Sequence, residues 1–172
     1  AAVTYALENV LLPGDHIVAA DNLYGGSYNL IVNNLSSRGI DHTIVDLNDF
    51  DALEKAIRPN TKVVYGETFG NPNSDVTDLE RVAEIAHSHG ILFIVDNTFG
   101  TPYLIRPIEH GVDVVVHSAT KFLGGHGAGL GGVIVDSGKF DFKAHADKYP
   151  TITAPDPNYH GAIFADAAPD AP

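Results

Sequence analysis

Short apolar runs alternate with amphipathic stretches along most of the chain. The runs are bounded by turn residues and cover positions 16–20, 43–45, 62–65, 91–95, 112–116 and 132–135. Stretches 28–35, 52–57 and 78–89 instead place apolar residues at helical spacing. Continuous apolar runs are typical of strands buried on both faces, and strands joined by helices form a parallel sheet. The sequence therefore predicts an α/β fold, a mostly parallel sheet covered by helices on both faces.

The connections and the chain ends refine this picture. Only a short Gly-rich stretch precedes the run 132–135, which favours an antiparallel last strand. Helical spacing starts at the first residues without a capping residue, and the chain from Pro150 onward is Pro-rich with no strand pattern. We expect a fragment: an α/β domain over residues 1–150 that lacks its N-terminal part, then an irregular segment over 151–172 leading toward an absent C-terminal domain.

Composition narrows the possible partners. Ten Lys and Arg residues face 22 Asp and Glu residues, a formal net charge of −12, so we expect no nucleic-acid partner. No apolar run approaches the ~20 residues that span a bilayer, and we expect a cytoplasmic protein without a membrane partner. The chain has no Cys, and its nine His residues include no His-Glu-x-x-His arrangement, so we predict no metal site.

Polar side chains follow several of the predicted strands. Ligands of open α/β sheets bind at the carboxyl ends of the strands, so these positions are the first candidates for a site. They include Asp21 to Gly26, Glu67 to Pro72, Asp96 to Thr98 and His117 to Lys121. Four loops therefore bring an aromatic ring, an amide, carboxylates, hydroxyls and an amine to one edge of the sheet.

Lys121 and Asp96 suggest a particular chemistry. Each has an ordinary explanation, because a strand-end Asp can cap a turn and most lysines are solvated surface amines. A lysine directly after a buried strand can instead be partly desolvated, with its pKa lowered, as a Schiff-base lysine requires. A carboxylate on a neighbouring strand end can hold a pyridinium nitrogen protonated. We interpret Gly124 to Gly127 as close-packed backbone beside this lysine, because a P-loop pattern is absent.

Two motifs carry a family resemblance. The segment Val95-Asp96-Asn97-Thr98-Phe99-Gly100-Thr101-Pro102, together with His117-Ser118-Ala119-Thr120-Lys121-Phe122, resembles the Cys/Met-metabolism enzymes that depend on pyridoxal 5'-phosphate (PLP). The resemblance covers essentially the whole chain and is closest to the O-acetylhomoserine sulfhydrylases. It implies that residues 1–150 are the large PLP-binding domain of a fold-type I enzyme.

The resemblance implies a role for each site residue. Lys121 would form a Schiff base with PLP and then serve as the base that moves protons on the substrate. Asp96 would pair with the pyridine nitrogen. Ser118 and Thr120 would bind the phosphate group.

Three further residues receive roles in the same way. Tyr24 would stack on the cofactor ring and exchange protons, whereas its alternative role is that of a packing aromatic at the sheet edge. Asn71 would reach the phenolic oxygen of the cofactor, or is simply a turn residue before Pro72. Thr98 would pack against the other ring face.

The implied reaction is a γ-replacement on O-acetylhomoserine, in which sulfide or a thiol displaces acetate to give homocysteine or methionine. The same scaffold serves cystathionine γ-synthase and methionine γ-lyase, and a non-catalytic α/β binding module remains an alternative. The family further implies a homo-oligomer, a dimer of dimers, in which a neighbouring subunit and segments outside residues 1–172 complete the phosphate and carboxylate sites.

Overall fold

The computed structural model describes residues 1–168 and shows one six-stranded sheet in the order β2-β1-β3-β4-β5-β6. The strands are β1 (His16–Ala20), β2 (Asp41–Val45), β3 (Thr61–Glu67), β4 (Leu92–Asp96), β5 (Val114–Ser118) and β6 (Gly132–Asp136). The first five pair in parallel, and β6 pairs antiparallel with β5. The predicted mostly parallel sheet and its antiparallel last strand are therefore confirmed.

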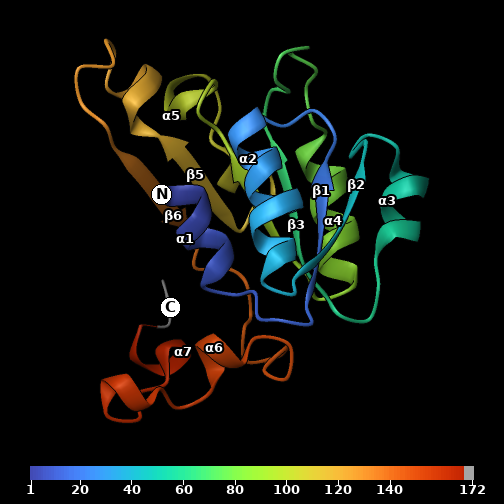
Figure 1. Ribbon diagram of the computed structural model, residues 1–172, viewed down its shortest axis with the longest axis vertical. Helices are drawn as coiled ribbons and strands as arrows, with labels where there is room; N and C mark the ends of the chain where they lie inside the picture. Colours follow the sequence, from blue (N-terminus) through green and yellow to red (C-terminus); the bar gives the residue numbers. More distant parts are fainter. Residues whose placement is uncertain (169–172) are drawn as a thin grey trace.

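Helices cover both faces of the sheet (Figure 1). The longer elements are α1 (Ala2–Glu8), α2 (Gly25–Asn29) with the π-helix η1 (Leu30–Leu35), α3 (Phe50–Ala56) and α4 (Leu79–Ser88). α1 and α2 lie in front of the sheet in Figure 1, and α4 lies behind it. Because the strand order reverses direction after β2, right-handed crossovers require α2 and α4 to lie on opposite faces.

Shorter helical elements fill the connections. They are α5 (Thr101–Leu104), η2 (Pro107–His110), η3 (Ala119–Leu123), α6 (Pro150–Thr153), η4 (Pro157–Tyr159) and α7 (Phe164–Ala167). Beyond β6 the described chain contains only such short pieces. Residues 169–172 of the C-terminal segment lie outside the described part. Within residues 1–168, none of the helices combines the length and apolarity needed to cross a membrane.

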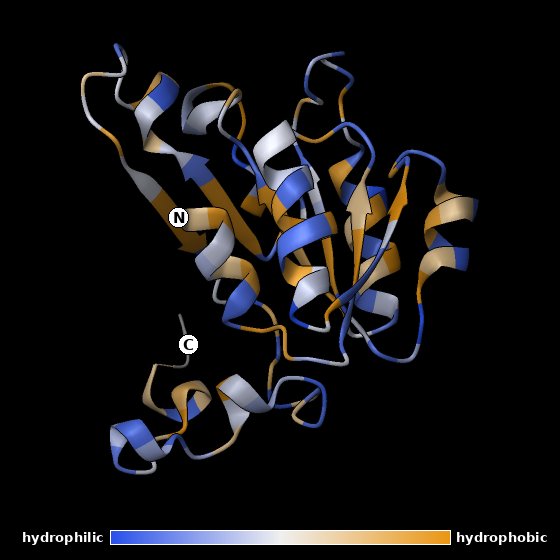
Figure 2. Ribbon diagram, in the orientation of Figure 1, coloured by the Kyte–Doolittle hydropathy of each residue, from blue (hydrophilic) through white to orange (hydrophobic). Residues whose placement is uncertain are grey.

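The strands supply most of the core. Every residue of β1 and β3 is buried, and the hydropathy colouring shows the apolar strands enclosed by helices with hydrophilic outer surfaces (Figure 2). α4 contributes Leu79, Val82, Ala83 and Ala86 from one side of the helix. Asp78 caps this helix, since its carboxylate accepts a hydrogen bond from the Arg81 amide at 3.2 Å. The buried strands form a rigid base for the loops at their ends.

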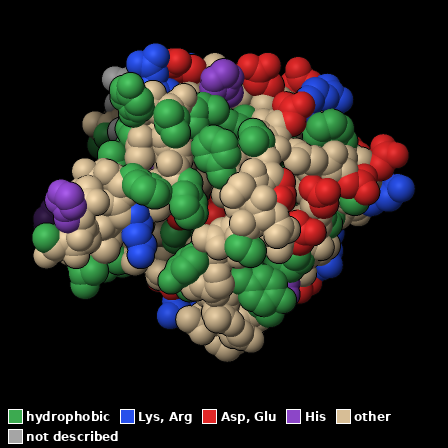
Figure 3. All heavy atoms as spheres, turned by 90° about the horizontal axis from the view of Figure 1, so that it is seen from above, with side chains coloured by type: hydrophobic (Ala, Val, Ile, Leu, Met, Phe, Trp, Pro, Cys, Tyr) green, Lys and Arg blue, Asp and Glu red, His purple; other side chains and the backbone are tan. Residues whose placement is uncertain are grey.

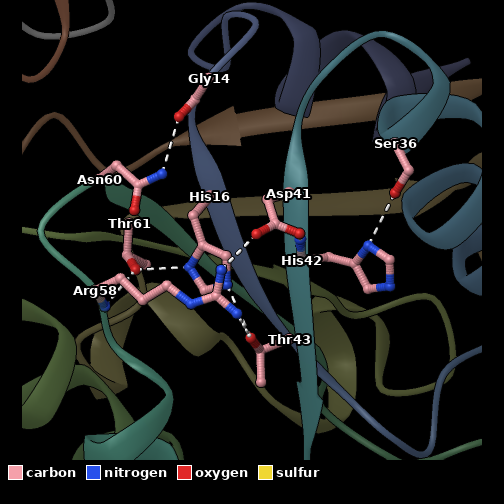
Figure 4. Close-up of polar contacts among 9 residues, drawn as sticks. All are labelled: Gly14, His16, Ser36, Asp41, His42, Thr43, Arg58, Asn60 and Thr61. Atoms are coloured by element: carbon pink, nitrogen blue, oxygen red, sulfur yellow. Dashed lines mark hydrogen bonds and ion pairs between the residues drawn. The ribbon is translucent and has the colours of Figure 1, made fainter.

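The amino ends of β1, β2 and β3 carry a polar cluster in which His16 and Thr61 are buried (Figure 4). The His16 ring lies between two hydroxyl groups, with Nδ1 2.7 Å from Thr61 Oγ1 and Nε2 2.9 Å from Thr43 Oγ1. Arg58 contacts both Thr43 and Asp41 beside it. Burial, with the nearby Arg58 charge, lowers the pKa of His16 to about 4. The histidine is therefore neutral at pH 7 and fixes three strand ends by hydrogen bonds.

An aromatic cluster closes the same end of the sheet. The rings of Phe140, Phe142 and Tyr149 meet edge to face, with centroids 5.0 to 5.4 Å apart. The Tyr149 hydroxyl donates to the Lys62 carbonyl at 2.6 Å and accepts from the Leu92 amide at 2.9 Å. The segment after β6 is thereby joined to β3 and β4.

Candidate active site

The loops at the carboxyl ends of the parallel strands surround a cavity of about 630 Å³. All seven residues singled out in the sequence line it: Tyr24, Asn71, Asp96, Thr98, Ser118, Thr120 and Lys121. They come from the ends of β1, β3, β4 and β5 and from the turn that follows β5. The fold therefore brings together side chains that lie up to 97 positions apart in the sequence.

Asp96 is the last residue of β4 and is half-buried. Burial raises the pKa of its carboxyl group above the ordinary value, and hydrogen bonds from Thr98 act in the opposite direction. The Thr98 amide and hydroxyl both donate to Oδ1. Among the described residues, Oδ2 has no hydrogen-bond donor. One carboxylate oxygen is thus fixed by the protein, and the other is available to a cationic group in the cavity.

Thr98 links the two central strand ends. Its hydroxyl donates to Asp96 Oδ1 and accepts the Ser118 amide at 2.8 Å. The orientation of the Asp96 carboxylate is therefore coupled to the end of β5. This bridging contact was not expected from the sequence, because the separation of 20 residues between Thr98 and Ser118 conceals it.

Two hydroxyl groups on the β5 side differ in their partners. The Ser118 side chain is half-buried and has no hydrogen-bond partner among residues 1–168. The Thr120 hydroxyl instead accepts the Gly131 amide at 3.1 Å. Ser118 is thus free to bind an anionic ligand group, while Thr120 also closes the turn between η3 and β6.

Lys121 follows β5 within η3, where its backbone departs from helical geometry with φ −90° and ψ −124°. The side chain is exposed, so the expected partial desolvation of this amine is wrong for the described chain. The reason lies in the following Gly-rich stretch, residues 124–131, which is exposed throughout and does not cover the lysine.

The expectation of close-packed backbone also fails for part of this stretch. A Cβ atom added at Gly124 would lie 2.5 Å from the Ala119 carbonyl oxygen, yet one added at Gly125 would meet no atom within 4 Å. Gly125 and Gly127 line the cavity instead. The glycines therefore form a loose rim beside Lys121.

Glu67 lines the cavity and was not among the predicted site residues. It ends β3 directly beside Asp96, with which it is paired in register. Its side chain is buried, and burial raises the pKa of Glu67 to about 7. The sequence contains a signal for it, because Glu67 follows a buried strand in the same manner as Asp96.

Apolar side chains surround the polar site. Phe99 and Phe122 are exposed at the cavity with ring centroids 5.6 Å apart. Viewed from above in Figure 3, many hydrophobic side chains gather on this face, whereas acidic side chains concentrate on one side of it. An apolar rim with a few convergent polar groups is typical of a small-molecule site.

An α/β sheet that presents a lysine amine, a half-buried carboxylate and a free hydroxyl in one cavity is suited to bind a small-molecule cofactor. Comparison with known proteins identifies the group. The chain belongs to the Cys/Met metabolism PLP-dependent enzyme family, whose sequence profile matches residues 1–164. PLP is thus the cofactor of the family to which this domain belongs.

Individual relatives are enzymes of sulfur amino-acid metabolism. The chain is 49% identical over 166 residues to a homocysteine synthase from Schizosaccharomyces pombe, matching 96% of this chain and 39% of that protein. It is 46% identical over 170 residues to an O-acetyl-L-homoserine sulfhydrylase from Corynebacterium glutamicum, matching 96% and 39% respectively. The chain thus spans about two fifths of the length of these relatives.

A solved structure shares the fold closely. An O-acetylhomoserine (thiol)-lyase structure from Campylobacter jejuni superposes with a TM-score of 0.91 at 39% identity, covering 96% of this chain and 41% of that one. That structure is described with N'-pyridoxyl-lysine-5'-monophosphate. The fold prediction of a fold-type I PLP-binding domain is therefore confirmed.

The cavity fits PLP in its donor and acceptor groups. The cofactor needs an amine for covalent attachment, an anion for its ring nitrogen and donors for its phosphate. Lys121 supplies the amine, the free Oδ2 of Asp96 is a suitable anion, and the unpartnered Ser118 hydroxyl is a suitable donor. Within the described residues no cluster of His, Asp or Glu is arranged to bind a metal ion.

Proposed function

We propose that this chain carries the cofactor site of a PLP-dependent enzyme that performs γ-replacement on O-acetylhomoserine with sulfide or a thiol. The observation that carries the proposal is the convergence of Lys121, Asp96 and Ser118 on one cavity. The similarity to homocysteine synthases and O-acetylhomoserine sulfhydrylases supports the choice of substrate.

The residues divide the work of binding the cofactor. Lys121 would hold it covalently, Asp96 would bind the ring nitrogen through Oδ2, and Ser118 with Thr120 would bind the phosphate. Tyr24 would stack on the cofactor ring, Asn71 would bind its phenolic oxygen, and Thr98, which fixes the Asp96 carboxylate, would pack against the other ring face. PLP, when bound, supplies the electron sink that stabilises negative charge on the substrate α carbon.

Lys121 also acts in proton transfer. With the cofactor bound, the Lys121 amine would move protons at the α and β carbons of the substrate as a general base and acid. The exposed position of Lys121 and the loose glycine rim leave this side chain room to move between two carbons. With the cofactor bound, the site would support loss of acetate from the γ carbon and addition of sulfide or a thiol at the same carbon.

A sister reaction on the same scaffold is the second candidate. The chain is 48% identical over 139 residues to a cystathionine gamma-lyase from Bacillus subtilis, matching 81% of this chain and 36% of that protein. The site residues serve either reaction. Turnover of O-acetylhomoserine with sulfide, compared with turnover of cystathionine and of methionine, separates these functions.

Further features of the whole protein are part of the proposal. We assign residues 1–150 to the PLP-binding domain and 151–172 to the connection toward a second domain. We also expect a cytoplasmic homo-oligomer, a dimer of dimers. Exposed apolar side chains support an assembly, since Tyr103 and Leu130 are each 92% exposed.

Covalent mapping of the cofactor tests the proposal. The chain is incubated with PLP, reduced with borohydride, digested and analysed by mass spectrometry. We expect the modification on Lys121 and its loss in Lys121→Ala, whereas Lys55→Ala, which alters an exposed lysine of α3, retains it. Stable modification of a different lysine in the unaltered chain would contradict the assignment of the site.

A further inference from the structure

Tyr24 is held by its main chain and not by its side chain. It is the N-cap residue of α2, and its carbonyl oxygen accepts the Tyr28 amide at 3.0 Å. Its own amide donates to Glu67 Oε1 at 2.5 Å. Tyr24 as a whole residue is 57% exposed, so packing alone does not fix the position of its ring at the cavity.

Glu67, which accepts the Tyr24 amide, is well placed to hold the Tyr24 main chain in position. The residue is 5% exposed, and the Thr77 hydroxyl donates to its carbonyl oxygen at 2.7 Å. The residue therefore has a fixed position on the central strand β3. We propose that Glu67 is a positioning residue whose carboxyl group anchors the start of α2 and thereby holds the Tyr24 phenol over the cavity.

The space beneath the Tyr24 ring supports this role. A Cβ atom added at Gly26 would lie 2.5 Å from Tyr24 Cε1, whereas one added at Gly25 would meet no atom within 4 Å. The ring thus lies directly over the Gly26 backbone. The main-chain anchor at Glu67 and the absent side chain at Gly26 together define the place of the phenol.

The charge of the anchor changes near neutral pH. Burial raises the pKa of Glu67 to about 7; the hydrogen bond from the Tyr24 amide acts in the opposite direction, and the neighbouring Asp96 carboxylate acts in the same direction as burial. The other titratable group close by on β3 is Tyr65, whose pKa is raised by burial, so it stays neutral. An amide donates more strongly to a carboxylate than to a neutral acid, so the anchor is stronger above pH 7 than below it.

This inference rests on the proposed function for its consequence in catalysis, but its structural core can be tested without cofactor. The chain is labelled with ¹⁵N and ¹³C, and NMR follows the Tyr24 amide and the Glu67 side-chain carboxyl carbon from pH 5.5 to 8.5. We expect both signals to titrate with the same midpoint near pH 7. Different midpoints, or a Tyr24 amide insensitive to pH, would overturn the proposal.

Substitutions separate the anchor from general packing. Glu67→Gln keeps an acceptor for the Tyr24 amide but removes the charge, so the pH response of that amide should vanish. Glu67→Ala removes the acceptor, and hydrogen exchange of the Tyr24 amide should accelerate by about tenfold or more. Glu84→Gln, at an exposed residue paired with Arg81, is the matched control and should change neither signal.

The ring position is tested by a second pair of variants. In Gly26→Ala the new methyl group displaces the flexible Tyr24 ring, so covalent capture of PLP at Lys121 should slow severalfold while the Tyr24 amide still titrates. Gly25→Ala is the control, since its methyl group enters open space. Equal capture rates in the two variants would contradict a role for the ring position.

The outcomes distinguish this inference from the proposed function. If the Tyr24 amide follows Glu67 but no cofactor attaches to Lys121, the anchor stands and the cofactor assignment fails. If Lys121 is modified but the Tyr24 amide does not respond to Glu67, the cofactor assignment stands and the anchor fails.

Discussion

His16 shows how one buried side chain makes stability depend on pH. In the folded chain its pKa is lowered from 6.5 to about 4, because the ring is buried between two threonine hydroxyls. Between these pH values the unfolded chain binds a proton that the folded chain excludes. The contribution of His16 to stability is therefore complete above pH 6.5 and is lost as the pH falls toward 4.

Chemical denaturation at several pH values tests this linkage. We expect the free energy of unfolding of the unaltered chain, minus that of His16→Gln, to fall by roughly 2–3 kcal/mol between pH 7 and pH 4. The comparison with His16→Gln is needed because Glu67, whose pKa is raised, makes the free energy of unfolding change with pH in the opposite direction. Subtracting the value of the variant removes this contribution. His126→Gln, at an exposed position, is the control, and a pH-independent difference for His16→Gln would refute the linkage.

Some residues of the site could be predicted from the sequence pattern, and others could not. Asp96 and Lys121 could be identified because each follows a long apolar run and lies in a distinctive motif. Glu67 was overlooked as a site residue because its function depends on burial and on the Tyr24 amide, 43 positions away in the chain. The exposure of Lys121 was also missed, because a pattern of glycines does not reveal whether the loop folds over its neighbour.

At the scale of elements, the apolar runs predicted where the strands lie, but some predicted boundaries differ from the observed ones by one or two residues. The predicted strand 91–95 is Leu92–Asp96, and 112–116 is Val114–Ser118. The shifts have a common cause, since Asp96 and Ser118 are polar yet pair within the sheet. The predicted helix 28–35 begins earlier, at Gly25, because the chain turns directly after Tyr24.

The attachment of the segment after β6 depends on the Tyr149 hydroxyl. It is buried and bonded to the Lys62 carbonyl and the Leu92 amide. Tyr149→Phe keeps the aromatic packing but leaves these two groups without their partner, so we expect a loss of about 1–3 kcal/mol in the free energy of unfolding. Denaturant titration measures it, and Tyr159→Phe, at an exposed ring, should cost much less.

At the scale of the whole molecule, exposed apolar surface and net charge have opposite effects on association between copies of the chain. Tyr103 and Leu104 of α5 are 92% and 69% exposed and favour association. The formal net charge of −12 produces repulsion between copies of the chain. Salt screens this repulsion but leaves the apolar contribution intact.

Analytical ultracentrifugation tests the proposed homo-oligomer. We expect larger species at higher protein concentration, and association that strengthens as NaCl rises from about 10 to 200 mM. The double variant Tyr103→Ser and Leu104→Ser should weaken association because it removes exposed apolar surface. A chain that remains monomeric under all these conditions would contradict the proposal.

The register of the central strands has a consequence for how this site can diversify. Glu67 lies opposite Asp96, and Asp96 lies opposite Val116, two positions before Ser118. The spacing of these groups is set by the ladder hydrogen bonds, and a slip of one residue would turn every side chain to the other face. The loops beyond the strand ends are free of that constraint. Sequence changes in these loops can therefore leave the relative positions of Asp96 and Ser118, which end β4 and β5, unchanged.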